Sequence, residues 1–193
     1  MIEGCSQEVQ IKEVRWMRPP DTIFKLNTDG SSLNNPDSIG GGGTLRDSLG
    51  KMVYPFTIPL GVGTNNRVET LAAIHGLQWC VQHGYKNIIL KVDSELLTKW
   101  IAQNIKSPWK LQYHIRTRIT PTNYLEFFQC KHTYREANST TDFLSKRSHK
   151  TDIVHDYYNN QQLPGAAKRS YLLEEMGMIN FRRRKLKRIK QPP

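Results

Sequence analysis

The chain has 193 residues with 28 Lys and Arg against 17 Asp and Glu, so its net charge is +11, and 37% of it is hydrophobic. This length fits one domain with tails better than two domains. No apolar run approaches the ~20 residues of a membrane helix, the N-terminus lacks a secretory-signal pattern, and the three cysteines lack disulfide or zinc spacing. We therefore expect an intracellular monomer, in the nucleus or cytoplasm and off the membrane, with nucleic acid as its first candidate partner.

Basic residues are concentrated near the C-terminus. Seven of the ten residues in 181–190 are basic and none is acidic. This run favours nucleic-acid contact, and 182–190 also fits a nuclear-import signal; a solvated end is the alternative. With Pro19-Pro20 as a separator, we divide the chain into an N-terminal arm over 1–20, a domain over 21–150 and a C-terminal extension with a basic tail over 151–193.

In the first half of the chain, three strands precede a helix. The predicted strands are Phe24–Asp29, Gly40–Arg46 and Lys51–Pro59. Their short connections allow only antiparallel pairing. Asn65-Asn66 then offers an N-cap for a long helix over Arg67–His83, which Gly84 ends.

The second half alternates strands with helices. The predicted elements are a strand over Asn87–Asp93, helices from Ser94 to about Gln103 and around Leu111–Ile119, a strand over Leu125–Thr133, and a helix from Asn138 or Ser139 through Lys146. The order βββαβααβα predicts an α/β fold with a five-stranded mixed sheet and helices on both faces. The crossover through the long helix predicts parallel pairing of the first and fourth strands.

Four carboxylates fall where chemistry would need them. Asp29 closes the first strand and Asp93 the fourth, so parallel pairing would bring both to one end of the sheet. Glu69 lies in the first turn of the long helix, on a stripe of small residues that would let the helix approach the sheet, and Asp142 lies in the first turn of the last helix. Each alone also fits a turn or helix-cap position. Together, four converging carboxylates require divalent cations.

Four motifs in this order resemble type 1 ribonuclease H. They are Asn27–Ser32 with Asn35-Pro36 and Gly40–Gly43, Thr64–Glu69 with Leu71–Ala73, Val92–Ser94, and Arg135–Asn138 with Asp142–Lys146. The resemblance covers about residues 14–148. Arg46-Asp47 with Gly50, and the Tyr134–Asn138 run, make this version similar to plant reverse-transcriptase-like domains, including those of non-LTR retroelements.

The resemblance implies a ribonuclease H-like fold and hydrolysis of the RNA strand of an RNA–DNA hybrid. The catalytic acids would be Asp29, Glu69, Asp93 and Asp142. They would hold two Mg²⁺ ions, which Mn²⁺ could replace; one would activate water and the other would stabilise the leaving 3′-oxygen. Substrate contacts would come from Gly30, Ser31, Asn35, Asn65, Asn66 and Arg67. Asn65 and Asn66 would lie in the minor groove, where the 2′-hydroxyl separates RNA from DNA.

The chain also departs from the family pattern. Bacterial members carry a loop histidine before the last acid, whereas His132 falls within a strand and fits a structural role. The basic tail could replace a basic protrusion that is missing here. A catalytically weak nucleic-acid-binding module, derived from a retroelement ribonuclease H domain, is the main alternative. The order Asp, Glu, Asp, Asp argues against a transposase or integrase-like nuclease.

Overall fold

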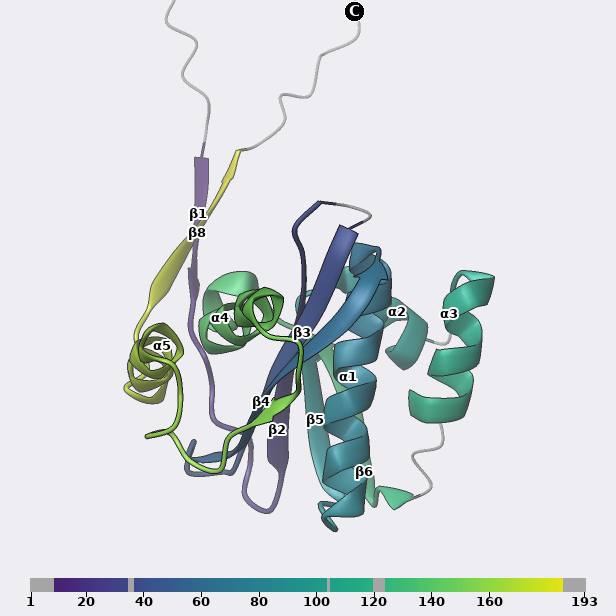
Figure 1. The fold of residues 1–193 in the computed structure, drawn as a ribbon. Coiled ribbons are helices and arrows are strands. Elements are labelled where there is room, and N and C mark those ends of the chain that lie inside the picture. Colours follow the sequence, from purple (N-terminus) through teal and green to yellow (C-terminus); the bar gives the residue numbers. More distant parts are fainter. Residues whose placement is uncertain (1–8, 35–36, 104, 120–123, 186–193) are drawn as a thin grey trace, which may run out of the picture.

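The computed structural model, which describes residues 9–34, 37–103, 105–119 and 124–185, has a mixed sheet covered by helices (Figure 1). Its strands lie in the order β6-β5-β2-β3-β4-β7. In chain order the central elements are β2 (Phe24–Ser32), β3 (Asp37–Arg46), β4 (Met52–Gly63), α1 (Asn65–Gln82), β5 (Asn87–Val92), α2 (Glu95–Ala102), α3 (Trp109–His114), a π-helical turn (Ile115–Ile119), β6 (Phe127–His132) and α4 (Ser139–Arg147). The predicted order of strands and helices is confirmed.

Strand β2 occupies the middle of the sheet. It pairs antiparallel with β3 and parallel with β5, as the crossover through α1 predicts. The parallel register places Thr28 opposite Val92. Asp29 and Asp93 are the next residues of the two strands, so both lie at the same end of this parallel pair. Asp29 does not close its strand as predicted, because β2 continues to Ser32 and pairs Asp29 with Gly42 of β3.

Glycines in β3 allow helices to pack closely on both faces of the sheet. A Cβ atom on Gly41 would lie 2.7 Å from the Ala72 Cβ of α1, and one on Gly42 would lie 2.7 Å from Leu144 of α4. Successive residues of a strand face opposite sides, so neighbouring glycines receive different helices. Figure 1 shows α1 and α4 on either side of the strands. The run of glycines therefore sets the short distance between the two helices that carry Glu69 and Asp142.

The C-terminal extension packs against this core. Helix α5 (Gly165–Glu175), which the sequence does not predict, packs on α4 and buries Tyr171 against it. Glu174 forms a buried ion pair with Arg46 of β3, whose guanidinium lies 4.5 Å from the ring of Trp16 and 4.9 Å from that of Tyr171. A short strand, β7 (His155–Asp156), pairs with β4 and adds a sixth strand to the five predicted.

The two ends of the described chain form a separate ribbon. Strand β1 (Val9–Val14) pairs antiparallel with β8 (Asn180–Lys185), and the ribbon projects away from the sheet (Figure 1). These strands lie in the predicted N-terminal arm and basic tail, because a pairing between residues so far apart leaves no local pattern. Residues 186–190 of the predicted import signal lie outside the described residues. In the described part of the chain, no helix combines the length and apolar character needed to cross a membrane.

Candidate active site

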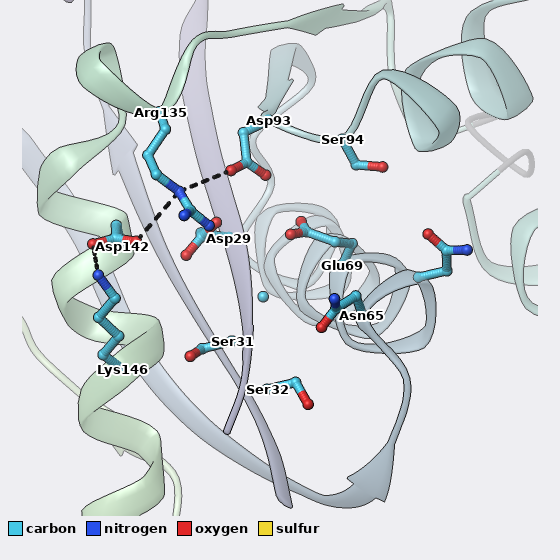
Figure 2. Close-up of a pocket in the computed structure, with 12 residues that line it drawn as sticks. Asp29, Ser31, Ser32, Asn65, Glu69, Asp93, Ser94, Arg135, Asp142 and Lys146 are labelled. Carbon is cyan, nitrogen blue, oxygen red and sulfur yellow. Dashed lines mark hydrogen bonds and ion pairs between the residues drawn. The ribbon is translucent and has the colours of Figure 1, made fainter. Parts of the chain in front are cut away.

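The four predicted acids line one pocket of about 360 Å³ (Figure 2). Asp29 lies in β2, Glu69 in α1, Asp93 directly after β5, and Asp142 in α4. One carboxylate oxygen from each of Asp29, Glu69 and Asp93 lies within 4.8 Å of the other two. Four elements distant in sequence thus bring their carboxylates to one place.

The start of α1 approaches β2 at Gly30. A Cβ atom there would lie 2.7 Å from the backbone nitrogen of Glu69 and 2.6 Å from a methyl group of Val68. Only a residue without a side chain permits this approach. Gly30 therefore allows Glu69 to lie beside Asp29.

The start of α4 is attached to β2 by Asn138. Its amide nitrogen donates to the Thr28 carbonyl at 3.2 Å, and its amide oxygen accepts from Asn27 at 2.9 Å. Asn138 occupies the N-cap position, one of the two predicted, but makes no side-chain cap hydrogen bond. Its contacts with β2 instead bring the first turn of α4, and Asp142 with it, toward the other acids.

Burial makes negative charge in this pocket unfavourable. Desolvation, reinforced by the charge of Asp93, raises the pKa of Asp29 from 3.8 to about 8, although a hydrogen bond from Ser145 opposes the shift. Desolvation and then the charges of Asp29 and Asp93 raise the pKa of Glu69 well above its ordinary value. Ionising the whole cluster therefore requires a compensating positive charge.

Two basic side chains supply part of that charge (Figure 2). The Nε atom of Arg135 lies 3.5 Å from Asp93 Oδ2 and 3.6 Å from Asp142 Oδ1. Lys146 Nζ lies 2.6 Å from Asp142 Oδ2. Neither contact was predicted from the sequence. The four-residue spacing of Asp142 and Lys146 on a helix could have indicated the second, but no sequence periodicity indicates the first.

Several carboxylate oxygens of the cluster suit a divalent cation. Among the described residues, Asp29 Oδ1, Glu69 Oε2 and Asp142 Oδ1 are buried without a hydrogen-bond partner, although Asp142 Oδ1 also pairs with Arg135 at 3.6 Å. Buried polar atoms are normally satisfied, and hard oxygen donors are the ligands that Mg²⁺ and Mn²⁺ prefer. The residues present therefore fit a divalent-metal site.

The predicted substrate residues divide into three groups. Gly30, Ser31, Asn65 and Asn66 line the pocket, together with Ser32 and Ser94, which were not predicted as substrate residues. Arg67 instead donates from Nη1 to the Val62 carbonyl at 2.9 Å. Asn35 lies outside the described residues.

The predicted cap of α1 is wrong. The helix begins at Asn65, and Thr64 is its N-cap, whose hydroxyl accepts from the Arg67 backbone nitrogen at 3.4 Å. Thr and Asn both cap helices well, so local preference does not decide between them. Asn65 and Asn66 lie in the first turn, beside Glu69.

His132 makes the contacts of a structural residue. Its Nε2 atom hydrogen-bonds to the Asp93 backbone carbonyl at 3.1 Å, and its ring packs edge-on against Tyr134. The imidazole thereby joins the end of β6 to Asp93, the residue that directly follows β5.

Known proteins are similar to this chain in sequence and in fold. A family model described as reverse transcriptase-like matches residues 27–148. Ribonuclease H of Blochmanniella floridana is 33% identical over 156 residues, which cover 71% of this chain and 89% of that protein. An Arabidopsis thaliana protein named "putative ribonuclease H protein" is 26% identical over 163 residues, 81% of this chain. The match covers only 26% of the Arabidopsis protein.

Two solved structures have the same architecture. RNase H1 from the halophilic archaeon Halobacterium salinarum superposes with a TM-score of 0.62 and 24% identity, covering 66% of this chain and 97% of that one. LC11-RNase H1, solved in complex with an RNA/DNA hybrid, gives a TM-score of 0.59 and 24% identity, with 65% and 95% covered. With the family match and the Blochmanniella relative, the sequence places this chain in the reverse transcriptase-like ribonuclease H family.

Proposed function

We propose that this protein is an endoribonuclease that hydrolyses the RNA strand of RNA–DNA hybrids. The observation that carries the proposal is the convergence of four carboxylates, three of which keep a buried oxygen without a hydrogen-bond partner within the described chain. Relatives named ribonuclease H, and a neighbour solved with an RNA/DNA hybrid, support this substrate class. All four acids belong to one chain, so a monomer would suffice.

Asp29, Glu69, Asp93 and Asp142 would hold two Mg²⁺ ions, with Mn²⁺ as a substitute. When bound, such ions activate a water molecule and stabilise the leaving 3′-oxygen. The protein orients two of its ligands for this role. Ser145 Oγ donates to Asp29 Oδ2 at 2.5 Å, and Lys146 binds Asp142 Oδ2, so in each acid the other oxygen, Oδ1, keeps no hydrogen-bond partner among the described residues.

Substrate recognition would use the side of the pocket formed by α1 and β2. Thr64 caps the helix, so capping does not explain the two asparagines that follow it. A carboxamide can donate and accept at once, which suits base edges and the 2′-hydroxyl that distinguishes RNA. We assign Asn65 and Asn66 to the minor groove and Gly30 and Ser31 to the backbone near the scissile bond. The basic C-terminal run would add phosphate contacts.

The decisive experiment is cleavage of an end-labelled RNA–DNA hybrid in Mg²⁺. Single-stranded RNA, duplex RNA and duplex DNA are the controls. We expect cleavage of the RNA strand of the hybrid alone, with 5′-phosphate and 3′-hydroxyl products and no reaction in EDTA. Binding of the hybrid without cleavage, in both Mg²⁺ and Mn²⁺, would overturn the proposal and identify the chain as a catalytically weak binding module.

A further inference from the structure

We propose that the two ends of the chain together form a second binding surface, which takes the sugar–phosphate backbone of the hybrid beyond the catalytic pocket. This inference rests on the proposed function and deepens it. The surface is a groove of about 400 Å³ between the β1–β8 ribbon and the start of α2. Its lining includes Lys12, Glu95, Tyr134, Arg182, Arg183 and Arg184.

The ribbon is held against the body of the protein through Tyr134. Lys12 Nζ donates to the Tyr134 hydroxyl at 3.1 Å. The cationic groups of Lys12 and Arg182 each lie 4.7 Å from the centre of the tyrosine ring. One cation comes from β1 and the other from β8, so both ends of the chain attach to the same aromatic side chain.

A second set of contacts joins β8 to Glu136, two residues after Tyr134. Arg182 Nη1 lies 3.2 Å from both carboxylate oxygens of Glu136, and the Asn180 amide donates to the Glu136 carbonyl at 3.0 Å. These contacts hold the Arg182 side chain and the β8 backbone that carries Arg183 and Arg184, which lowers the entropy lost when the strand binds a ligand.

The charge of the groove suits a polyanion. Four basic side chains line it against the single acid Glu95. Arg182 is compensated by Glu136, whereas Arg183 and Arg184 are exposed and make no ion pair within the described ranges of the chain. Guanidinium groups bind phosphates through paired donors. Because successive side chains of a strand face opposite sides, Arg182 and Arg184 share the face of β8 that meets Tyr134 and Arg183 takes the other face. Basic residues repeated along an extended strand suit a row of phosphates better than a single small anion.

The groove and the catalytic pocket are lined by adjacent residues of the chain. Ser94 and Arg135 line the pocket, while their neighbours Glu95 and Tyr134 line the groove. The two hollows therefore share two backbone segments, and one polymer can occupy both. The family match spans residues 27–148, so β1 and β8 lie outside it. The groove thus combines residues of the matched segment with strands that lie outside it.

The test is the salt dependence of hybrid binding by the full-length chain carrying Arg183→Gln and Arg184→Gln. Binding is measured by fluorescence anisotropy in EDTA, which prevents cleavage. Each lost phosphate contact flattens the plot of log affinity against log salt by about 0.9, so we expect the slope to fall by about 1 to 2. Lys12→Gln should weaken binding in the same direction.

The matched control is Lys168→Gln with Arg169→Gln on α5. It removes the same charge from adjacent positions outside the groove, so its salt slope should equal that of the wild type. Equal slopes for the groove variant and the wild type, or equal losses for both double variants, would overturn the inference. Cleavage by the wild type is measured in parallel. A groove-dependent slope without cleavage would refute the proposed function alone, and cleavage with an unchanged slope would refute the groove alone.

Discussion

Replacing Asp29 by Asn should stabilise the protein in EDTA and, in Mg²⁺, abolish hybrid cleavage. The side chain is 1% exposed, and burial with the charge of Asp93 raises its pKa to about 8 from 3.8. At neutral pH the folded protein therefore retains a proton that the unfolded chain releases. The stability contributed by this carboxyl is complete below about pH 4 and is lost as the pH rises toward 8.

The size of the effect follows from the two pKa values. Each pH unit between them changes the free energy of unfolding by ~1.4 kcal/mol. At pH 7 the ionisable side chain therefore lowers stability by about 4 kcal/mol relative to its acidic limit. Asn is neutral at every pH, and its amide oxygen can accept the same hydrogen bond from Ser145. We expect it to recover about 1–3 kcal/mol at pH 7 and less at pH 5.

Urea denaturation in EDTA at pH 5, 7 and 8.5 measures this difference. The control is Asp152→Asn, which removes the same charge from an exposed site and should follow the wild type. Adding Mg²⁺ should stabilise the wild type more than Asp29→Asn, because a ligand stabilises the state that binds it. If Asp29→Asn is less stable than the wild type at pH 8.5 in EDTA, the raised pKa of Asp29 is refuted. If it retains more than about a tenth of the cleavage rate, the metal assignment is refuted.

Four further substitutions test the site and its support. Asp93→Asn should reduce cleavage of labelled hybrid below about a tenth of the wild-type rate with an unchanged circular dichroism spectrum, since no neighbour replaces that charge; a faster variant would exclude Asp93 as a ligand. Asn66→Ala should weaken hybrid binding in titrations without lowering the unfolding free energy, whereas Thr64→Ala should lower it by about 1 kcal/mol and preserve affinity; the reverse pattern would make Asn66 a cap. Glu174→Ala should cost about 3–5 kcal/mol in urea denaturation, because it leaves Arg46 buried and unpaired; a loss below about 1 kcal/mol would make α5 peripheral.

The carboxylate cluster could be predicted because it depends on topology. A crossover connection forces the first and fourth strands to pair parallel, and the carboxyl ends of parallel strands meet at one edge. Asp29 and Asp93 follow directly from that rule. The glycine run in β3 could also indicate close packing, since a strand with no side chains over four positions leaves room for helices on both faces.

The basic residues around the acids could not be predicted in the same way. Arg135 reaches Asp93 and Asp142 from a short 3-10 helix, Arg135–Ala137, which has no hydrophobic periodicity. Thr64 and Asn65 are both favourable N-cap residues. Which of them caps the helix depends on where β4 ends relative to α1. Both details are set by tertiary structure.

The strands and the helix near the two chain ends could not be predicted for a related reason. Strands β1 and β8 are rich in polar and charged residues, and their partners lie at opposite ends of the sequence. Helix α5 is short and mixes exposed leucines with buried residues, so its apolar stripe is weak. Sequence patterns therefore indicate an arm and a tail where the structure has β1, α5 and β8.

The C-terminal extension nevertheless helps to place a catalytic acid. The Glu174 carboxylate accepts from the Thr140 backbone nitrogen at 2.9 Å and from its hydroxyl at 2.8 Å, which supplies the capping contact that Asn138 does not make. Asn138 can therefore bind β2 while the first turn of α4 stays satisfied. Asp142 lies in that same turn. Its position at the pocket thus depends on a glutamate outside the matched family segment, and the extension belongs to the structural support of the active site.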